Sequence, residues 1–256
     1  MKTLRALLLF AMTALPALSL AQSFTPKSGT EWLSEEAREM QDDEFANPGY
    51  FTVDRGLELF NATGTNGKSC ANCHGADGET LDIARLTRFP VFDPLTQKPM
   101  TLQGRIHACS QQHLGNAPMK YDSKQAIALE TFVRNLARGE IIDVETDGPL
   151  APFVQKGKAY FEARRGQMDM ACSDCHVNYV GSRLRAQVLS QGQLNGYPTY
   201  RLANQRVNAI HQRFSQCENR LRATFQKAGA DDYVNLELYL MSRGNGLPIE
   251  TPAVRF

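Results

Sequence analysis

The sequence predicts an all-α fold made of two similar small domains that are related by an internal repeat. The motif Cys-x-x-Cys-His occurs twice, at residues 70–74 and 172–176. Each copy has the same setting, because a Gly precedes it by 14 or 15 residues and a lone Cys follows it, at positions 109 and 217. Few stretches alternate apolar and polar residues, which is the pattern of half-buried strands. A period of roughly 100 residues gives each copy the length of a domain.

Residues 1–21 have the layout of a secretory signal peptide. Two cations, Lys2 and Arg5, precede an apolar run that ends at Leu20, and Ser19-Leu20-Ala21 offers a small-x-small cleavage site. The run is shorter than the roughly 20 apolar residues of a membrane span, and no later run comes close. We therefore expect export to the periplasm without a membrane span, and a mature chain of 235 residues.

The mature chain is close to electrically neutral. Removing residues 1–21 takes away two cations, so 26 Lys and Arg stand against 27 Asp and Glu. This balance gives no electrostatic sign of a nucleic-acid partner, and global charge selects no other partner. Apolar residues make up 42% of the sequence, which is enough for ordinary cores.

Residues 22–49 are predicted to form an acidic N-terminal arm. A helix is expected over Glu31–Phe45, with Ser34 as its N-cap and acidic residues in its first turn, where negative charge suits the helix dipole. Trp32, the only Trp, is a candidate anchor for this arm.

The repeat predicts the remaining boundaries. We expect a first domain at 50–140, an acidic linker with Gly and Pro at 141–152, a second domain at 153–246 and an extended tail at 247–256. Each domain ends in an apolar segment with helical periodicity that is closed by Arg-Gly, and Gly suits a helix C-cap. These segments are Leu129–Gly139 and Val234–Gly244.

The two Cys-x-x-Cys-His motifs predict two covalently bound haem c groups, and hence two cytochrome c-like domains. In such a motif the two sulfurs form thioethers with the haem and the adjacent His ligates the iron. A zinc site made by the four cysteines, or disulfides, are the alternatives. A His directly after each pair and the wide separation of the pairs favour haem. The predicted residues are Cys70, Cys73, Cys172 and Cys175 for attachment, with His74 and His176 as axial ligands.

The second axial ligand of each iron is less closely defined. Met119 and Met241 are candidates, because Met is a common ligand in small c-type domains. Cys109 and Cys217 occupy matching positions of the repeat, and an anionic thiolate would favour ferric iron. A disulfide between these two cysteines is also compatible with an exported protein. Three further histidines could be ligands, although a surface or interdomain position is the simpler interpretation: His107, His113 and His211.

An arginine-rich segment surrounds Cys217. Residues 183–222 contain seven arginines, no lysine and a single acid, Glu218. Haem propionates, an anionic substrate or an exposed basic face would each account for this charge. Arg213 precedes Cys217 by four residues, so on a helix the two side chains share a face. A cation there would lower the pKa of the thiol and hold an anion beside the sulfur.

The chain resembles the dihaem SoxA subunits of the sulfur-oxidising SoxAX cytochromes. The resemblance covers nearly the whole mature chain and rests on Cys70–His74, Cys109 and several segments of the second half. These segments are Cys172–His176, Leu189–Gly192, Asn195–Leu202, His211–Phe214 with Cys217, Leu236–Leu240 and Gly246–Arg255.

The resemblance implies one His and one Cys ligand for each iron: His74 and Cys109 on the first, His176 and Cys217 on the second. Cys217 would be the active-site cysteine, which this family can carry as a persulfide, and Arg213 the neighbouring cation. The implied activity is that of an L-cysteine S-thiosulfotransferase, which joins thiosulfate or a similar sulfur anion oxidatively to a cysteine of the SoxYZ carrier. The protein would form a heterodimer with the monohaem subunit SoxX. Electrons would pass to SoxX and then to a small c-type cytochrome.

The sequence departs from the pattern of this family in places. Ala203-Asn204 stand where a Trp is expected, and Gln212 and Ser215 replace residues that are often Arg. Two other functions remain compatible with the motifs. One is a dihaem electron-transfer cytochrome without sulfur transfer, and the other is a thiosulfate dehydrogenase that forms tetrathionate.

Overall fold

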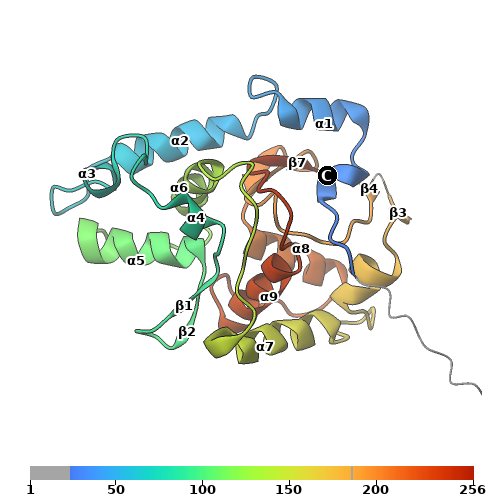
Figure 1. Ribbon diagram of the computed structural model, residues 1–256. Coiled ribbons are helices and arrows are strands. Elements are labelled where there is room, and N and C mark those ends of the chain that lie inside the picture. Colours follow the sequence, from blue (N-terminus) through green and yellow to red (C-terminus); the bar gives the residue numbers. More distant parts are fainter. Residues whose placement is uncertain (1–23, 186) are drawn as a thin grey trace, which may run out of the picture.

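The computed structural model describes residues 24–185 and 187–256 (Figure 1). The predicted signal peptide at 1–21 and the first two residues of the predicted arm therefore lie outside the described residues. Within those residues, no helix combines the length and the apolar character needed to cross a membrane.

Two pairs of crossing helices form the centre of the fold. In the first pair α2 (Tyr50–Asn61) packs against α6 (Lys124–Asn135), and in the second α7 (Ala151–Glu162) packs against α9 (Asp231–Ser242). Figure 1 shows the first pair in cyan and green and the second in yellow-green and red. The same arrangement occurs once in each half of the chain, which confirms the internal repeat.

Gly56 and Gly157 allow these helices to cross closely. A Cβ atom on Gly56 would lie 2.2 Å from the carbonyl oxygen of Ala128 on α6, and one on Gly157 would lie 2.0 Å from that of Asn235 on α9. Non-bonded atoms cannot approach to such distances, so a residue without a Cβ is required at both crossings. The paired glycines of the sequence repeat therefore mark equivalent contacts.

Shorter helices carry the cysteines. The first motif runs through α3 (Ala71–His74), and Cys109 lies on α5 (Leu102–Leu114). The second motif runs into a π-helix (Asp174–Asn178), and Cys217 lies on α8 (Ile210–Arg220). Two further helical segments are α4 (Ile83–Leu86) and a 3₁₀ turn (Gly148–Leu150).

Three small sheets lie among the helices of the described residues, so the all-α prediction is not confirmed. Their strands have only two or three residues, too few to show an alternating pattern in the sequence. In the largest sheet β5 pairs antiparallel with β6 and parallel with β7. The strands are β1 (Val91–Asp93), β2 (Lys98–Met100), β3 (Arg183–Leu184), β4 (Gln187–Val188), β5 (Thr199–Arg201), β6 (Arg206–Asn208) and β7 (Ala253–Arg255).

The predicted helix of the arm is present but shorter than expected. α1 spans Glu35–Asp42 instead of Glu31–Phe45, and Ser34 is its N-cap, as predicted. A 3₁₀ turn at Gly29–Trp32 replaces the beginning of the expected helix.

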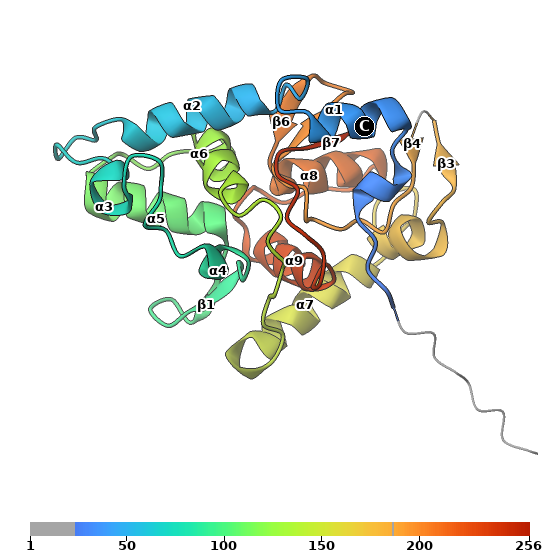
Figure 2. The same ribbon diagram turned by 45° about the horizontal axis from the view of Figure 1, so that its top comes forward.

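The arm packs against the C-terminal tail, where α1 lies beside β7 (Figure 2). Glu250 accepts hydrogen bonds from the hydroxyls of Ser28 and Thr30, at 2.6 and 2.8 Å. Ala253 and Val254 of β7 are completely buried. The tail is therefore a packed strand that holds the arm in place.

One continuous core joins the two halves. It contains Phe60 and Phe132 from the first helix pair, and Phe161 and Leu236 from the second. Ile142, in the predicted linker, is buried in the same core. The domain boundaries predicted from the repeat stay predictions.

A stack of aromatic rings lies at the interface between the two halves of the chain. Tyr121 lies between His107 and His211, with ring centroids 5.4 and 5.0 Å away and nearly parallel planes. His211 accepts a hydrogen bond from the backbone N–H of Gly229, and its other ring nitrogen lies 3.0 Å from Glu237. Both histidines are buried, which agrees with the predicted interdomain position.

Gly157→Ala is expected to lower the free energy of unfolding by about 1–3 kcal/mol, because the new methyl group overlaps the carbonyl of Asn235. Urea unfolding followed by circular dichroism measures the change. Gln155→Ala, at an exposed position of the same helix, is the control and should change stability by less than about 0.5 kcal/mol. Unchanged stability of Gly157→Ala would contradict the close crossing.

Candidate functional site

The second motif and Cys217 line one cavity of about 550 Å³. The π-helix, α8 and the hairpin β3-β4 border it, and α7 and α9 also contribute side chains. Four of the residues predicted to bind haem lie on its walls: Cys172, Cys175, His176 and Cys217. Much of the remaining lining is apolar, including Phe161, Leu189, Leu194, Phe214, Leu236 and Leu240.

The imidazole of His176 is held by the loop that comes after it. Its Nδ1 is hydrogen-bonded to the carbonyl oxygen of Ser190 at 2.9 Å, which leaves Nε2 available on the other side of the ring. Gly192 has φ +73° and passes so close that a Cβ there would lie 2.8 Å from the ring. A hydrogen bond from the second nitrogen to a carbonyl is the usual way in which a metal-ligating His is oriented. The loop thus fixes both the tautomer and the orientation of His176.

The surroundings of Cys217 favour the thiolate form of its side chain. Burial by itself would raise the pKa of its thiol, but the guanidinium of Arg213, the nearby imidazole of His176 and the charge of Arg220 together lower this pKa to about 6. The thiolate is the nucleophilic and metal-ligating form of Cys. α8 places Arg213 one turn before Cys217, so the cation is built into the helix that carries the sulfur.

Two poorly solvated arginines lie near this sulfur. Nη1 of Arg213 is buried and finds no hydrogen-bond partner among the described residues. Arg201 on β5 is 2% exposed, and burial followed by the nearby charge of Arg213 lowers the pKa of its guanidinium. Tyr197 lies close to both arginines. Two neighbouring cations with so little solvent favour the thiolate of Cys217 and other anions in the cavity.

The first motif and Cys109 form a second site with different surroundings. Burial raises the pKa of Cys70 to about 11, and the nearby Cys109 and Cys73 contribute in the same direction. Burial also raises the pKa of Cys109, and Arg105 opposes this shift only in part. His74 is the last residue of α3. Each half therefore has the same set of three cysteines and one histidine, but the charges around the lone cysteine differ.

Three alternatives considered from the sequence find no support in the described residues: Met241 as a ligand, a disulfide and a zinc site. Met241 is buried in the core, where Nη2 of Arg134 lies 3.4 Å from its sulfur. All six cysteines are free, so Cys109 and Cys217 do not form a disulfide. No group of three or more His, Cys, Asp or Glu side chains in residues 24–185 and 187–256 is placed to hold a metal such as zinc.

Three residues that shape the cavity were not singled out by the sequence. Gly192 and Tyr197 lie in two segments on which the resemblance rests, Leu189–Gly192 and Asn195–Leu202, but neither residue was given a role there. Arg201 was one of seven arginines, and nothing in its neighbourhood marked it as buried. Its burial depends on the pairing of β5 with β7, which no local pattern reveals. Four arginines of the segment line the cavity: Arg183, Arg201, Arg213 and Arg220.

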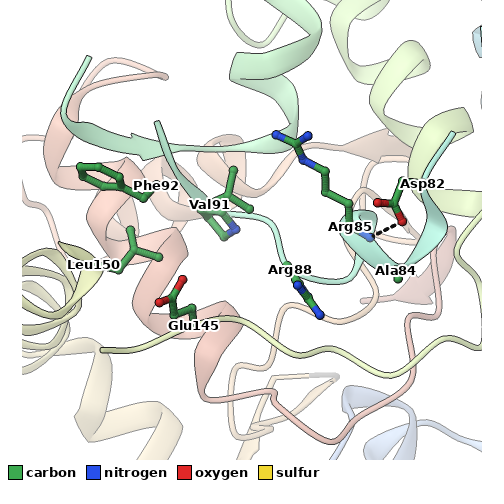
Figure 3. Close-up of a pocket in the computed structure, with 9 residues that line it drawn as sticks. Asp82, Ala84, Arg85, Arg88, Val91, Phe92, Glu145 and Leu150 are labelled. Atoms are coloured by element: carbon green, nitrogen blue, oxygen red, sulfur yellow. Dashed lines mark hydrogen bonds between the residues drawn. The ribbon is translucent and has the colours of Figure 1, made fainter. Parts of the chain in front are cut away.

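A separate cavity of about 410 Å³ lies where the predicted linker meets the first half (Figure 3). Arg85, Arg88 and Phe92 line it together with Glu145, and Asp82 accepts a hydrogen bond from the backbone N–H of Arg85. Neither Cys nor His is part of the described lining, so this cavity offers no sulfur nucleophile and no haem ligand.

The cavity beside Cys217 has the chemical features of a haem c site. One motif supplies two thiols and an oriented imidazole, and α8 supplies a thiolate. Apolar walls suit a porphyrin, and the buried arginines suit its propionates or another anion. The residues present therefore fit this group.

Known proteins share this sequence and fold. The family model of the SoxA/TsdA cytochrome c domain matches residues 55–142 and 156–249. The L-cysteine S-thiosulfotransferase subunit SoxA of Paracoccus pantotrophus is 38% identical over 245 residues, which cover 95% of this chain and 83% of the relative. The same subunit of Pseudaminobacter salicylatoxidans is 38% identical over 228 residues, which cover 88% and 79%. A crystal structure of SoxXA from P. pantotrophus matches with a TM-score of 0.85 and 38% identity, over 90% of this chain and 86% of that one.

The two segments that match the family model correspond to the two halves of the internal repeat. Each contains one helix pair and one Cys-x-x-Cys-His motif, so both halves are cytochrome c-like. With relatives and a solved structure that match over most of its length, the chain belongs to the SoxA/TsdA cytochrome c family, among the SoxA subunits.

Proposed function

We propose that the protein is a haem-dependent thiosulfotransferase subunit, which couples thiosulfate or a similar sulfur anion oxidatively to a cysteine of a carrier protein. The observation that carries this proposal is the position of Cys217, which lines one largely apolar cavity together with His176 and Arg213 and whose surroundings favour its thiolate. The site thus combines a sulfur nucleophile, a haem-ligand set and a cation. The relatives at 38% identity bear the name L-cysteine S-thiosulfotransferase subunit SoxA.

Each half is proposed to hold one haem c. In the second half Cys172 and Cys175 would form the thioethers, with His176 and Cys217 as axial ligands. When bound, haem c supplies one-electron oxidation and reduction. The corresponding set of the first half is Cys70 and Cys73 for attachment, with His74 and Cys109 as axial ligands.

Arg213 is proposed to bind the anionic substrate. Thiosulfate carries two negative charges, and Nη1 of Arg213 has a donor that no described residue uses. A charge-assisted hydrogen bond from this donor would hold the sulfonate end and leave the sulfane sulfur directed at Cys217. Arg201 adds positive potential to the same region, which favours anions over neutral molecules.

Cys217 then forms a sulfur–sulfur bond with the sulfane sulfur. Both reactants are anions, so this bond forms with the loss of two electrons to the electron acceptors of the complex. A cysteine thiolate of the carrier next attacks the sulfane sulfur, the bond to Cys217 breaks, and Cys217 leaves as a thiolate. The second step is an exchange that needs no oxidant. No proton is gained or lost in either step.

The proposed partners are those of the family. A crystal structure named SoxXA matches over 90% of this chain, which supports a heterodimer with the monohaem subunit SoxX. The SoxYZ carrier would receive the sulfur, and a small c-type cytochrome would receive the electrons. The signal peptide predicted at 1–21 supports a periplasmic location. A persulfide on Cys217 is proposed as a stored form of the enzyme.

Intact-mass analysis of the haem-loaded protein after exposure to thiosulfate tests the proposal. We expect two haems and a removable adduct of roughly 112 Da for a thiosulfonate or roughly 32 Da for a persulfide, lost with reductant. Cys217→Ala should carry no adduct, whereas Cys109→Ala, the matched change in the first half, should keep it. Failure of the wild type to form an adduct at any sulfur load counts against the transferase. Tetrathionate as the product, with no sulfur on the carrier, would instead indicate the dehydrogenase.

Arg213→Gln is expected to lower kcat/KM for thiosulfate by about 10- to 100-fold, because a charge-assisted hydrogen bond to the substrate is lost. Arg213→Lys keeps the charge and should retain more activity than Arg213→Gln. Arg206→Gln is the matched control, since Arg206 belongs to the same segment but does not line the cavity. Steady-state kinetics over a thiosulfate series gives these values. Equal losses in Arg213→Gln and Arg206→Gln would rule out a specific role for Arg213.

A further inference from the structure

Glu218 is a buried carboxylate immediately after Cys217, and it has no role in the chemistry proposed above. Only 2% of the residue is exposed. Its Oε1 accepts hydrogen bonds from the hydroxyl of Tyr160 and from Nη1 of Arg165, both at 2.6 Å. Its Oε2 accepts one from the hydroxyl of Tyr233 at 2.5 Å. One side chain of α8 therefore joins α7, α9 and the loop that contains Arg165.

The guanidinium of Arg165 is fixed by more than this ion pair. It lies over the ring of Tyr160, with 3.8 Å between its central carbon and the ring centroid, and it also donates to the backbone carbonyl of Tyr160. The backbone of Arg165 pairs with that of Met170, through hydrogen bonds of 3.0 and 3.3 Å. A shift of Glu218 would therefore move Arg165 and, with it, the turn between residues 165 and 170.

The same turn is bound to the end of α8. The backbone N–H of Met168 donates to the carbonyl of Leu221 at 3.3 Å, and that of Gln167 donates to the carbonyl of Arg222 at 3.4 Å. A Cβ on Gly166 would lie 2.2 Å from the carbonyl oxygen of Leu221. The turn and the C-terminal end of α8 therefore cannot move independently.

The turn leads directly into the second haem motif. Asp174 accepts hydrogen bonds from the backbone N–H of Ala171 at 2.9 Å and from the side chain of Arg164 at 3.1 Å. Asp174 is the first residue of the π-helix that contains Cys175 and His176. A continuous chain of contacts thus runs from Glu218, through Arg165 and the turn, to His176.

We propose that Glu218 is a positioning residue that sets where the sulfur of Cys217 lies relative to His176. Cys217 and Glu218 are adjacent on α8, so a shift or rotation of the helix at Glu218 also moves the sulfur. The three donors come from α7, α9 and the turn that leads to the motif, so they hold α8 against the framework that carries the motif. This inference rests on the proposed function in one respect only, which is that the His176–Cys217 geometry matters for sulfur transfer.

The first half provides an internal reference. The residue after Cys109 is Ser110, which is buried and accepts a hydrogen bond from the amide of Asn116 at 3.0 Å. No carboxylate stands at this position, so the first site lacks the connection that Glu218 makes. Loss of Glu218 should therefore affect one haem site and leave the other unchanged.

The test uses the haem-loaded, full-length protein and its low-spin ferric EPR signals. Cys217→Ala first identifies which signal belongs to the second site. Glu218→Gln and Tyr233→Phe should then shift or broaden that signal and leave the signal of the first site unchanged. Adduct formation with thiosulfate should slow by about 10- to 100-fold in Glu218→Gln, with a smaller loss in Tyr233→Phe. Glu162→Gln, on the exposed face of α7, is the matched control and should change neither measurement.

Two results would overturn this inference. One is an unchanged second-site signal in both variants while the wild type forms its adduct normally. The other is a changed signal in Glu218→Gln but not in Tyr233→Phe, since Glu218 would then act through its charge and not through position. If the variants alter the signal as expected but the wild type forms no adduct, positioning is supported and the proposed transferase fails. Tyr233→Phe removes a single hydroxyl, so it keeps the test valid if Glu218→Gln does not fold.

Discussion

The structure of the second half depends on a thiolate held inside an apolar cavity. Desolvation alone would protonate Cys217, and the guanidinium of Arg213 on the same helix reverses this preference. A cation in that place is itself costly unless an anion is near, so Arg213 and Cys217 stabilise each other's charged forms. The cavity, the loop around His176 and the sheet that carries Arg201 all surround this pair.

The repeat shows how one plan supports two different sites. Both halves have a close helix crossing, at Gly56 and Gly157, and a motif that precedes a lone cysteine. Only a few side chains make the two sites different. Arg105 and Arg213 each lie one turn before the lone cysteine, but the thiol pKa is raised for Cys109 and lowered for Cys217. Cys217 also has Arg220 nearby and Glu218 beside it. The charges around the two sulfurs therefore differ although the helix pairs and motifs correspond.

Much of this arrangement could be predicted from the sequence, because its signals are local. The two motifs, the glycines before them and the spacing of Arg213 from Cys217 depend on neighbours a few residues away. The sheet of β5, β6 and β7 could not be predicted, since its strands are too short to show a period and its partners are far apart. The burial of Arg201 could not be predicted either, because it depends on the same sheet. Glu218 was visible as a lone acid, but its three donors come from distant segments.

The N-terminal arm and the C-terminal tail contact each other at the edge of the cavity, so both segments are coupled to whatever the cavity binds. Gly29 and Trp32 of the arm and Arg255 and Phe256 of the tail border the same cavity as Cys217. Arg255 also donates a hydrogen bond to Glu250, which accepts another from the hydroxyl of Thr30 in the arm. By thermodynamic linkage, whatever occupies the cavity and touches these residues also stabilises the contact between arm and tail. Protection of residues 24–34 from proteases is therefore a measure of how full the cavity is.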